Sequence, residues 1–235
     1  MIDNNLVALI ITFLISLIWL RANDYLAHKG WMSSRLSRKI IHTGTGPIFV
    51  VCWLLFPNDQ LSRYLAALVP LAFTMQFLLI GLGIIKDEAS VKAMSRSGDR
   101  REILKGPLYY GIVFVLMTIL FWFDSPVGII ALMLLCGGDG LAEILGRRLG
   151  KHKIPWSKNK TFLGSIGMLI GGWFFAVLII GIYIYAGIFT PPLRIYIPGI
   201  TIIAFIAMVV ESLPIPDFDN ITITLTGVIL GLILF

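Results

Sequence analysis

Two carboxylates stand in residues 137–161, the stretch of the sequence richest in groups that could do chemistry. Asp139 and Glu143 are four residues apart, so on a helix they share one face, and Arg147 lies on that face one turn later. The charged residues that follow Glu143 in this stretch are all basic: Arg147, Arg148, Lys151, Lys153, Lys158 and Lys160. Carboxylates that can hold a divalent cation, next to cations that can hold phosphate, predict a metal–polyphosphate site.

The end of this basic stretch is well placed to bind an anion. Lys158, Lys160 and Thr161 directly precede an apolar segment, and the start of a helix offers free N–H groups and the positive end of a dipole. The stretch is not a Walker A loop, because His152 stands where that motif requires Ser or Thr. We predict that the phosphates of a nucleotide contact Arg147, Arg148, Lys151, Lys158, Lys160 and Thr161, and that Lys160 is also catalytic.

A second basic group opens another apolar segment. Arg35, Lys39 and His42 recur at three- and four-residue spacing, so one helix face is basic at the expected membrane surface. We assign Arg38 and Lys39 to the nucleotide. His42 is predicted to be catalytic, as a donor to phosphate or as a proton acceptor, and a histidine that merely lies at the membrane interface is the alternative.

An acidic group near the end of the chain completes the set of candidate residues. Glu211 precedes a loop that ends in Asp217, Asp219 and Asn220, on the same expected side of the membrane as the basic loops. Polyphosphate and carboxylates repel each other unless a divalent metal bridges them. We therefore predict ligands of a divalent metal at Asp139, Glu143, Glu211 and Asp219, a catalytic role for Asp139 as well, and a nucleotide contact at Asn220. A salt bridge within the membrane is the alternative for Asp139.

The composition indicates an integral membrane protein. Of the 235 residues, 57% are hydrophobic and only 14% are charged, against about 25% charged in soluble domains. The net charge of +6 does not indicate nucleic acid binding, because no basic stripe is interleaved with aromatic residues on a polar face. Cys52 and Cys136 lie in separate apolar runs, so they predict neither a metal site nor a disulfide framework.

About eight transmembrane helices are expected. The apolar runs are 6–20, 40–56, 64–85, 108–123, 126–145, 162–189, 195–210 and 221–235. A bilayer excludes open sheet edges, so the fold is predicted to be all-α and polytopic, with residues 1–235 as a single transmembrane catalytic domain. The first run has no basic residue before it, which favours a retained span over a signal peptide, and no transit peptide is expected.

The basic residues segregate to one side of this eight-span arrangement. Of the 19 Lys and Arg, all except Arg63 and Arg194 fall in loops 21–39, 86–106, 146–161 and 211–220. The positive-inside rule then predicts that these loops are cytoplasmic and both termini are outside. The expected location is the cytoplasmic membrane, with the site on the cytoplasmic face.

Four sequence blocks in order resemble a known family. They are RKIIHTGTG, SRSGDRREILKGPLYY, GGDGLAEILGRRLGKHKIPWSKNKTFLGSIGM and ESLPIPDFDNITITL. Together they are similar to the phytol kinases and, more broadly, to the CTP-dependent polyprenol kinases, which include the farnesol and dolichol kinases. The resemblance implies transfer of the γ-phosphate of CTP to an isoprenoid alcohol, with Mg²⁺.

The same resemblance implies roles for individual residues. It places Asp139 at the metal, Lys158, Lys160 and Thr161 at the phosphates, and matches Arg147–Arg148 and Asp219–Asn220 to paired motifs of the family. The expected partners are the lipid bilayer, an isoprenoid alcohol and a nucleoside triphosphate; the oligomeric state is open. A phosphatidate cytidylyltransferase-like enzyme is the alternative. A transporter is disfavoured, because the charges gather at one membrane face rather than across it.

Overall fold

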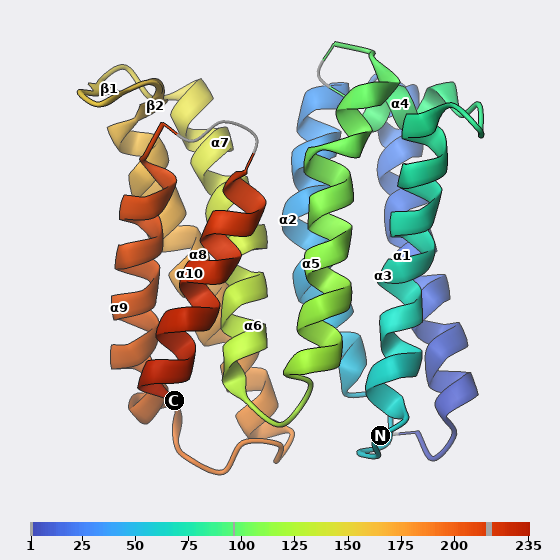
Figure 1. The fold of residues 1–235 in the computed structure, drawn as a ribbon, viewed down its shortest axis with the longest axis vertical. Coiled ribbons are helices and arrows are strands. Elements are labelled where there is room, and N and C mark those ends of the chain that lie inside the picture. Colours follow the sequence, from blue (N-terminus) through green and yellow to red (C-terminus); the bar gives the residue numbers. More distant parts are fainter. Residues whose placement is uncertain (1, 96, 215–217) are drawn as a thin grey trace. The chain divides into compact units, whose positions relative to one another are not determined.

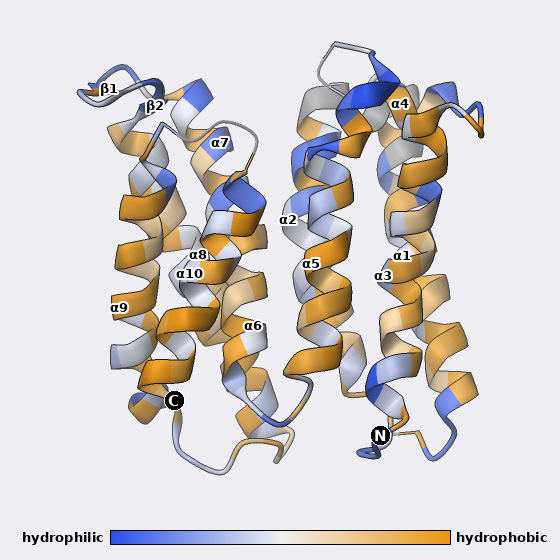
Figure 2. Ribbon diagram, in the orientation of Figure 1, coloured by the Kyte–Doolittle hydropathy of each residue, from blue (hydrophilic) through white to orange (hydrophobic). Residues whose placement is uncertain are grey.

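The chain folds into two compact units, Met1–Ile119 and Leu120–Phe235 (Figure 1). The computed structural model describes residues 2–95, 97–214 and 218–235, and each unit is described here by itself. In both units long apolar helices carry their hydrophilic residues mainly at the ends and in the loops (Figure 2). The prediction that the whole chain is one catalytic domain stays a prediction.

The first unit consists of four long helices with two short ones. Its elements are α1 (Asn5–His28), α2 (Ser34–Trp53), α3 (Ser62–Leu82), α4 (Glu88–Met94), the 3₁₀ helix η1 (Arg100–Leu104) and α5 (Gly106–Leu120). Ser33 caps α2 by accepting a hydrogen bond from the Leu36 N–H. Pro47 lies inside α2, where it lacks an N–H to donate. At the opposite end of the unit, the Asn5 side chain donates to Asp59 at 2.8 Å and ties α1 to the loop before α3.

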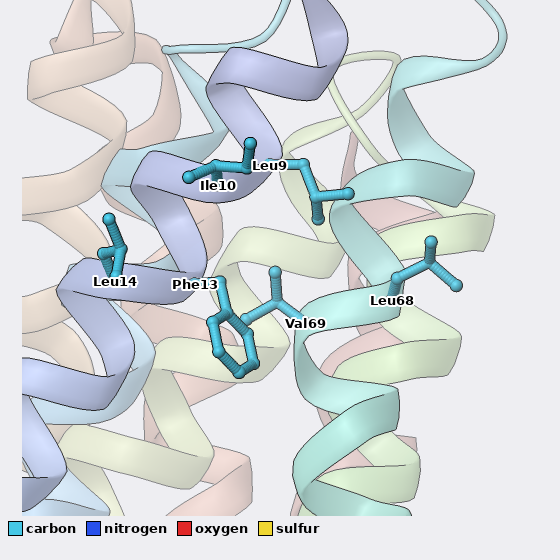
Figure 3. Close-up of a pocket in the computed structure, with 6 residues that line it drawn as sticks. All are labelled: Leu9, Ile10, Phe13, Leu14, Leu68 and Val69. Carbon is cyan, nitrogen blue, oxygen red and sulfur yellow. The ribbon is translucent and has the colours of Figure 1, made fainter.

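An apolar cavity of about 280 Å³ lies between α1 and α3 (Figure 3). It is lined by Leu9, Ile10, Phe13, Leu14, Leu68 and Val69. Such a lining offers no group that could bind phosphate or transfer a proton. The chemistry of the molecule must therefore be sought elsewhere.

The second unit is built around one buried helical path. This path runs through α6 (Pro126–Met133), the π-helical segment η2 (Leu134–Asp139) and α7 (Gly140–Arg148). A short antiparallel hairpin follows, and then three long helices: β1 (Lys153–Ile154), β2 (Ser157–Thr161), α8 (Phe162–Tyr185), α9 (Leu193–Glu211) and α10 (Asp219–Leu234). In an 18-residue apolar window of the central path 78% of the residues are buried, compared with 44% in such a window of α8 and 33% in one of α9. Asp139 is thus carried by the most enclosed helix of the unit.

Glycines let α8 approach this central path closely. A Cβ added at Gly138 would come within 2.6 Å of Met168, and one at Gly167 within 2.9 Å of the Leu141 carbonyl oxygen. These two glycines therefore bring the helices together.

We expect Gly171→Ala to destabilise the protein. The new Cβ would collide with the Gly137 carbonyl oxygen and the Leu141 side chain, and overpacking of this kind costs about 1–3 kcal/mol. The matched control is Gly181→Ala in the same helix, where the Cβ meets only Leu193, at 3.8 Å. Thermal unfolding in detergent should give a lower Tm for Gly171→Ala and an equal or higher Tm for Gly181→Ala, because alanine favours helix. Equal Tm values for the two variants would contradict this packing.

The structure confirms the all-α, polytopic membrane fold. Each of the eight predicted apolar segments contains a helix, and among the described residues six helical segments are long and apolar enough to span a membrane. The other two are α2, which carries three cations in its first two turns, and α10, with 16 residues. The count of eight spans and the outward termini remain predictions. The hairpin was not predicted; it lies between α7 and α8, outside the apolar helices.

Candidate active site

The basic stretch after α7 folds into the β1–β2 hairpin. Ile154 pairs with Ser157, so Pro155 and Trp156 form a two-residue turn, and proline suits its first position. The next pair joins Lys153 to Thr161, so the register shifts and residues 158–160 are extra residues on β2. An irregularity of this kind re-aims side chains away from the regular alternation of a strand.

Lys160, on this irregular part of β2, binds two acids that are distant in sequence. Its Nζ lies 2.5 Å from Glu211 Oε1, at the end of α9, and 3.0 Å from Asp219 Oδ2, at the start of α10. The Glu211 side chain is only 5% exposed, whereas those of Lys160 and Asp219 are 22% and 31% exposed. One lysine thus ties the hairpin to the ends of two helices.

The electrostatics of this cluster keep Lys160 charged. Burial by itself would lower the pKa of Lys160, but the adjacent carboxylates of Glu211 and Asp219 raise it above its ordinary value. The negative charges of Asp139 and Asp219 also act on Glu211. The structure therefore brings together four of the predicted site residues, which are Asp139, Lys160, Glu211 and Asp219.

Asp139 is placed by an unusual piece of helix. It ends the π-helical segment η2 and stands just before α7, and its side chain is half-buried. π-helical turns inside α-helices are rare and occur frequently at functional sites. The sequence predicted helix at this position but not the π-helical turn.

The donor set fits a magnesium ion that is held partly by substrate phosphates. Carboxylate oxygens suit Mg²⁺, which usually takes one or two carboxylates together with phosphates and water. Among the residues that the structure describes, no group of three or more acidic, histidine or cysteine side chains could hold a metal on its own. Lys160 engages Glu211 and Asp219, and Glu143 is 3.3 Å from Arg147 in an ion pair. The four acids therefore do not form a ready cage of carboxylates, and their roles as metal ligands stay predictions.

Several residues predicted to bind nucleotide phosphates have other surroundings. The buried hydroxyl of Thr161 caps α8, accepting a hydrogen bond from the Gly164 N–H at 3.1 Å. Asn220 is the second residue of α10, half-buried, and its carbonyl accepts from Thr224. The remaining predicted cations are exposed on α7 and around the hairpin: Arg147, Arg148, Lys151 and Lys158. Asp217 lies outside the described residues.

Arg38, Lys39 and His42 belong to α2 of the first unit. Lys39 is 8% exposed, and the His42 ring lies 4.5 Å from the Tyr110 ring on α5. The Tyr110 hydroxyl also donates to the His42 carbonyl at 2.7 Å. Two of the four sequence blocks therefore meet in the first unit and the other two meet in the second.

The sequence analysis missed Trp156 and Ser212. The Trp156 Nε1 donates to Ser212 Oγ at 3.2 Å, which adds a second link between the hairpin and the end of α9. The Pro155–Trp156 pair within a polar stretch was a signal for a turn with an exposed aromatic residue. The pairing with Ser212 could not be predicted from local sequence patterns, since 56 residues separate the two.

Comparison with known proteins shows to which family the chain belongs. No family model and no solved structure matches the chain. The chain is 40% identical over 226 residues to "Probable phytol kinase 3, chloroplastic" of Glycine max, covering 95% of this chain and 70% of that protein. It is 41% identical over 209 residues to "Farnesol kinase, chloroplastic" of Arabidopsis thaliana, covering 88% and 68%. For "Phytol kinase 1, chloroplastic" of the same plant, the identity is 35% over 214 residues, covering 90% and 70%. The chain therefore belongs to the family of phytol and farnesol kinases.

Proposed function

We propose that the protein transfers the γ-phosphate of CTP to an isoprenoid alcohol, giving the monophosphate and CDP. The relatives' names support the acceptor class and the kinase reaction. The observation that carries the proposal is the cluster of Lys160, Glu211 and Asp219 beside Asp139, at the end of the apolar helices and under a basic hairpin. CTP as the donor rests on the resemblance of the sequence blocks.

Phosphoryl transfer needs positioning and charge neutralisation more than covalent chemistry from the protein. In this proposal Lys160 and the exposed cations of the hairpin bind the donor phosphates. Asp139 holds Mg²⁺, which would offset the negative charge that develops on the transferred group. Glu211 and Asp219 hold the Lys160 ammonium in place, so little reorganisation is needed when phosphate binds.

The acceptor suits a site at the end of apolar helices. The tail of an isoprenoid alcohol stays in the lipid, while its hydroxyl lies near the headgroups, at the level where the hairpin follows α7. The test is a panel of phytol, farnesol, geranylgeraniol and a long polyprenol, offered to the purified protein with CTP and Mg²⁺. We expect phosphorylation of phytol, of farnesol or of both, since these are the two alcohols in the names of the relatives. Phosphorylation of none of the panel would overturn the assignment.

We also propose that the site faces the cytoplasm, from within the cytoplasmic membrane. The relatives are named as chloroplastic, which gives no support to this membrane, so the proposal rests on the segregation of Lys and Arg alone. Both native cysteines are buried, so added cysteines can report accessibility. In intact cells an impermeant thiol reagent should label a cysteine at Asp59 but not one at Lys153. Labelling of both from outside would contradict the topology.

A further inference from the structure

Trp156 presents an aromatic ring to solvent at the turn of the basic hairpin. The residue is 57% exposed, and its ring nitrogen is already bonded to Ser212 Oγ at 3.2 Å. Ser212 is itself held, because its hydroxyl donates to the Val209 carbonyl at 2.6 Å and the residue is 4% exposed. The indole is therefore fixed at one edge while much of its surface remains accessible.

The ring of Trp156 is anchored next to the cluster of Lys160, Glu211 and Asp219. Trp156 bonds to Ser212 and Lys160 bonds to Glu211, and these two partners are consecutive residues at the end of α9. The same hairpin thus offers a flat aromatic ring and a fixed ammonium group, which are bonded to the consecutive residues Ser212 and Glu211. A nucleotide presents the matching pair of groups, a flat base and a chain of phosphates.

We propose that Trp156 stacks on the base of the nucleoside triphosphate that donates the phosphate. Every base has a π-face, and stacking on an aromatic side chain contributes substantially to binding without reading the base in detail. The inference rests on the proposed function in one respect, that the donor is a nucleoside triphosphate. Trp156 lies within the third of the four sequence blocks, but neither the resemblance of that block nor the names of the relatives assign it a role.

The competing role is a tryptophan that anchors the hairpin at the membrane interface. Interfacial tryptophans place the ring in the headgroup region and leave the N–H to polar surroundings. The Trp156 N–H instead donates to Ser212 within the protein. This hydrogen bond fixes the orientation of the ring, which favours stacking on a base. The exposed Trp31, 77% accessible in the loop between α1 and α2, offers a matched interfacial control.

The experiment compares Trp156→Ala, Trp156→Phe and Trp31→Ala in the full chain in lipid nanodiscs. Equilibrium binding of radiolabelled CTP without any alcohol gives a readout that does not depend on phosphoryl transfer. Trp156→Ala should weaken CTP binding about ten- to a hundredfold. Trp156→Phe should bind CTP more tightly than Trp156→Ala but less tightly than the unchanged protein, because its ring can stack but lacks the N–H that fixes the indole. Trp31→Ala should match the unchanged protein.

Fluorescence supplies a second readout from a variant that keeps an aromatic ring at the turn. CTP should quench tryptophan emission of the unchanged protein, and that quenching should be lost in Trp156→Phe. Equal quenching in both proteins, or a Trp156→Ala variant that alters the KM for the alcohol but not CTP binding, would overturn the proposal in favour of a membrane anchor. CTP binding is measured without an alcohol, so its result does not depend on phosphoryl transfer. Failure to phosphorylate any alcohol would contradict the proposed function but would not decide whether Trp156 binds the base.

Discussion

Asp139→Asn should reduce phosphoryl transfer by about a hundredfold to a thousandfold or more without weakening the fold. Asparagine has the same shape as aspartate but no charge, so the attraction for Mg²⁺ is lost. The charges of Asp139 and Asp219 both act on Glu211, which is 5% exposed. Removing one of three neighbouring negative charges relieves repulsion, so the free energy of unfolding should stay the same or rise.

The measurement is kcat with saturating alcohol and CTP, together with Tm in detergent. Asp124→Asn is the matched control: it makes the same chemical change in the exposed turn before α6, 15 residues before Asp139. That variant should keep kcat. Near-normal turnover in Asp139→Asn, or an equal fall in stability and activity, would mean that Asp139 is structural.

The second large effect is expected for Lys160→Met, which should lose both stability and activity. Methionine fills much of the same space but leaves the carboxylates of Glu211 and Asp219 without their shared cation. Removing one partner of a buried ion pair costs about 3–5 kcal/mol, and the partial exposure of Lys160 and Asp219 argues for a loss below that range, about 2 kcal/mol. Activity should fall further than unfolding explains, because the donor phosphates lose a fixed ammonium group.

A second substitution separates these two losses. Adding Glu211→Gln to Lys160→Met removes one of the stranded charges, so Tm should recover in part while kcat stays low. Recovery of kcat together with Tm would show that Lys160 acts only through stability. Lys158→Met is the comparison on the same strand: Lys158 is exposed, so its loss should raise the KM for CTP modestly and leave Tm unchanged.

A change of pH cannot replace the Lys160→Met variant. The folded-state pKa of Lys160 is raised, so the stabilisation from its pairing is complete below the unfolded value of about 10.4. It is lost only as the pH rises through the folded pKa. An assay between pH 6 and about 9 therefore leaves Lys160 charged, and an activity change in that window does not come from deprotonation of Lys160.

The sequence predicted the helices, and it singled out the candidate site residues, because both depend on local patterns. Long apolar runs can only be satisfied as helices in a membrane, and a charge inside such a run is costly unless it has a use. Acids in a loop on the basic side are not explained by the positive-inside rule. Asp139, Lys160, Glu211 and Asp219 could each be singled out in this way. Their meeting around Lys160 could not, because its two partners lie 51 and 59 residues along the chain.

Local competition explains the other differences. Thr161 was predicted to hold phosphate because it stands at a helix start, and the same position makes its hydroxyl the cap of α8. The π-helical turn before Asp139 leaves no periodicity in a run where every residue is apolar or glycine. The hairpin depends on a Pro155–Trp156 turn inside a stretch too polar to show strand alternation. His42 meets Tyr110 across 68 residues, again beyond local patterns.

The most direct test of the kinase assignment follows the label of CTP into lipid. A kinase acts between the β- and γ-phosphates, whereas a cytidylyltransferase acts at the α-phosphate and releases pyrophosphate. The purified protein is incubated with phytol or farnesol, Mg²⁺ and CTP labelled at either the γ or the α position, and the lipid is extracted. We predict label in the isoprenoid monophosphate from γ-labelled CTP, with CDP formed and unlabelled lipid from α-labelled CTP. Lipid labelled from the α position, with release of pyrophosphate, would contradict the account.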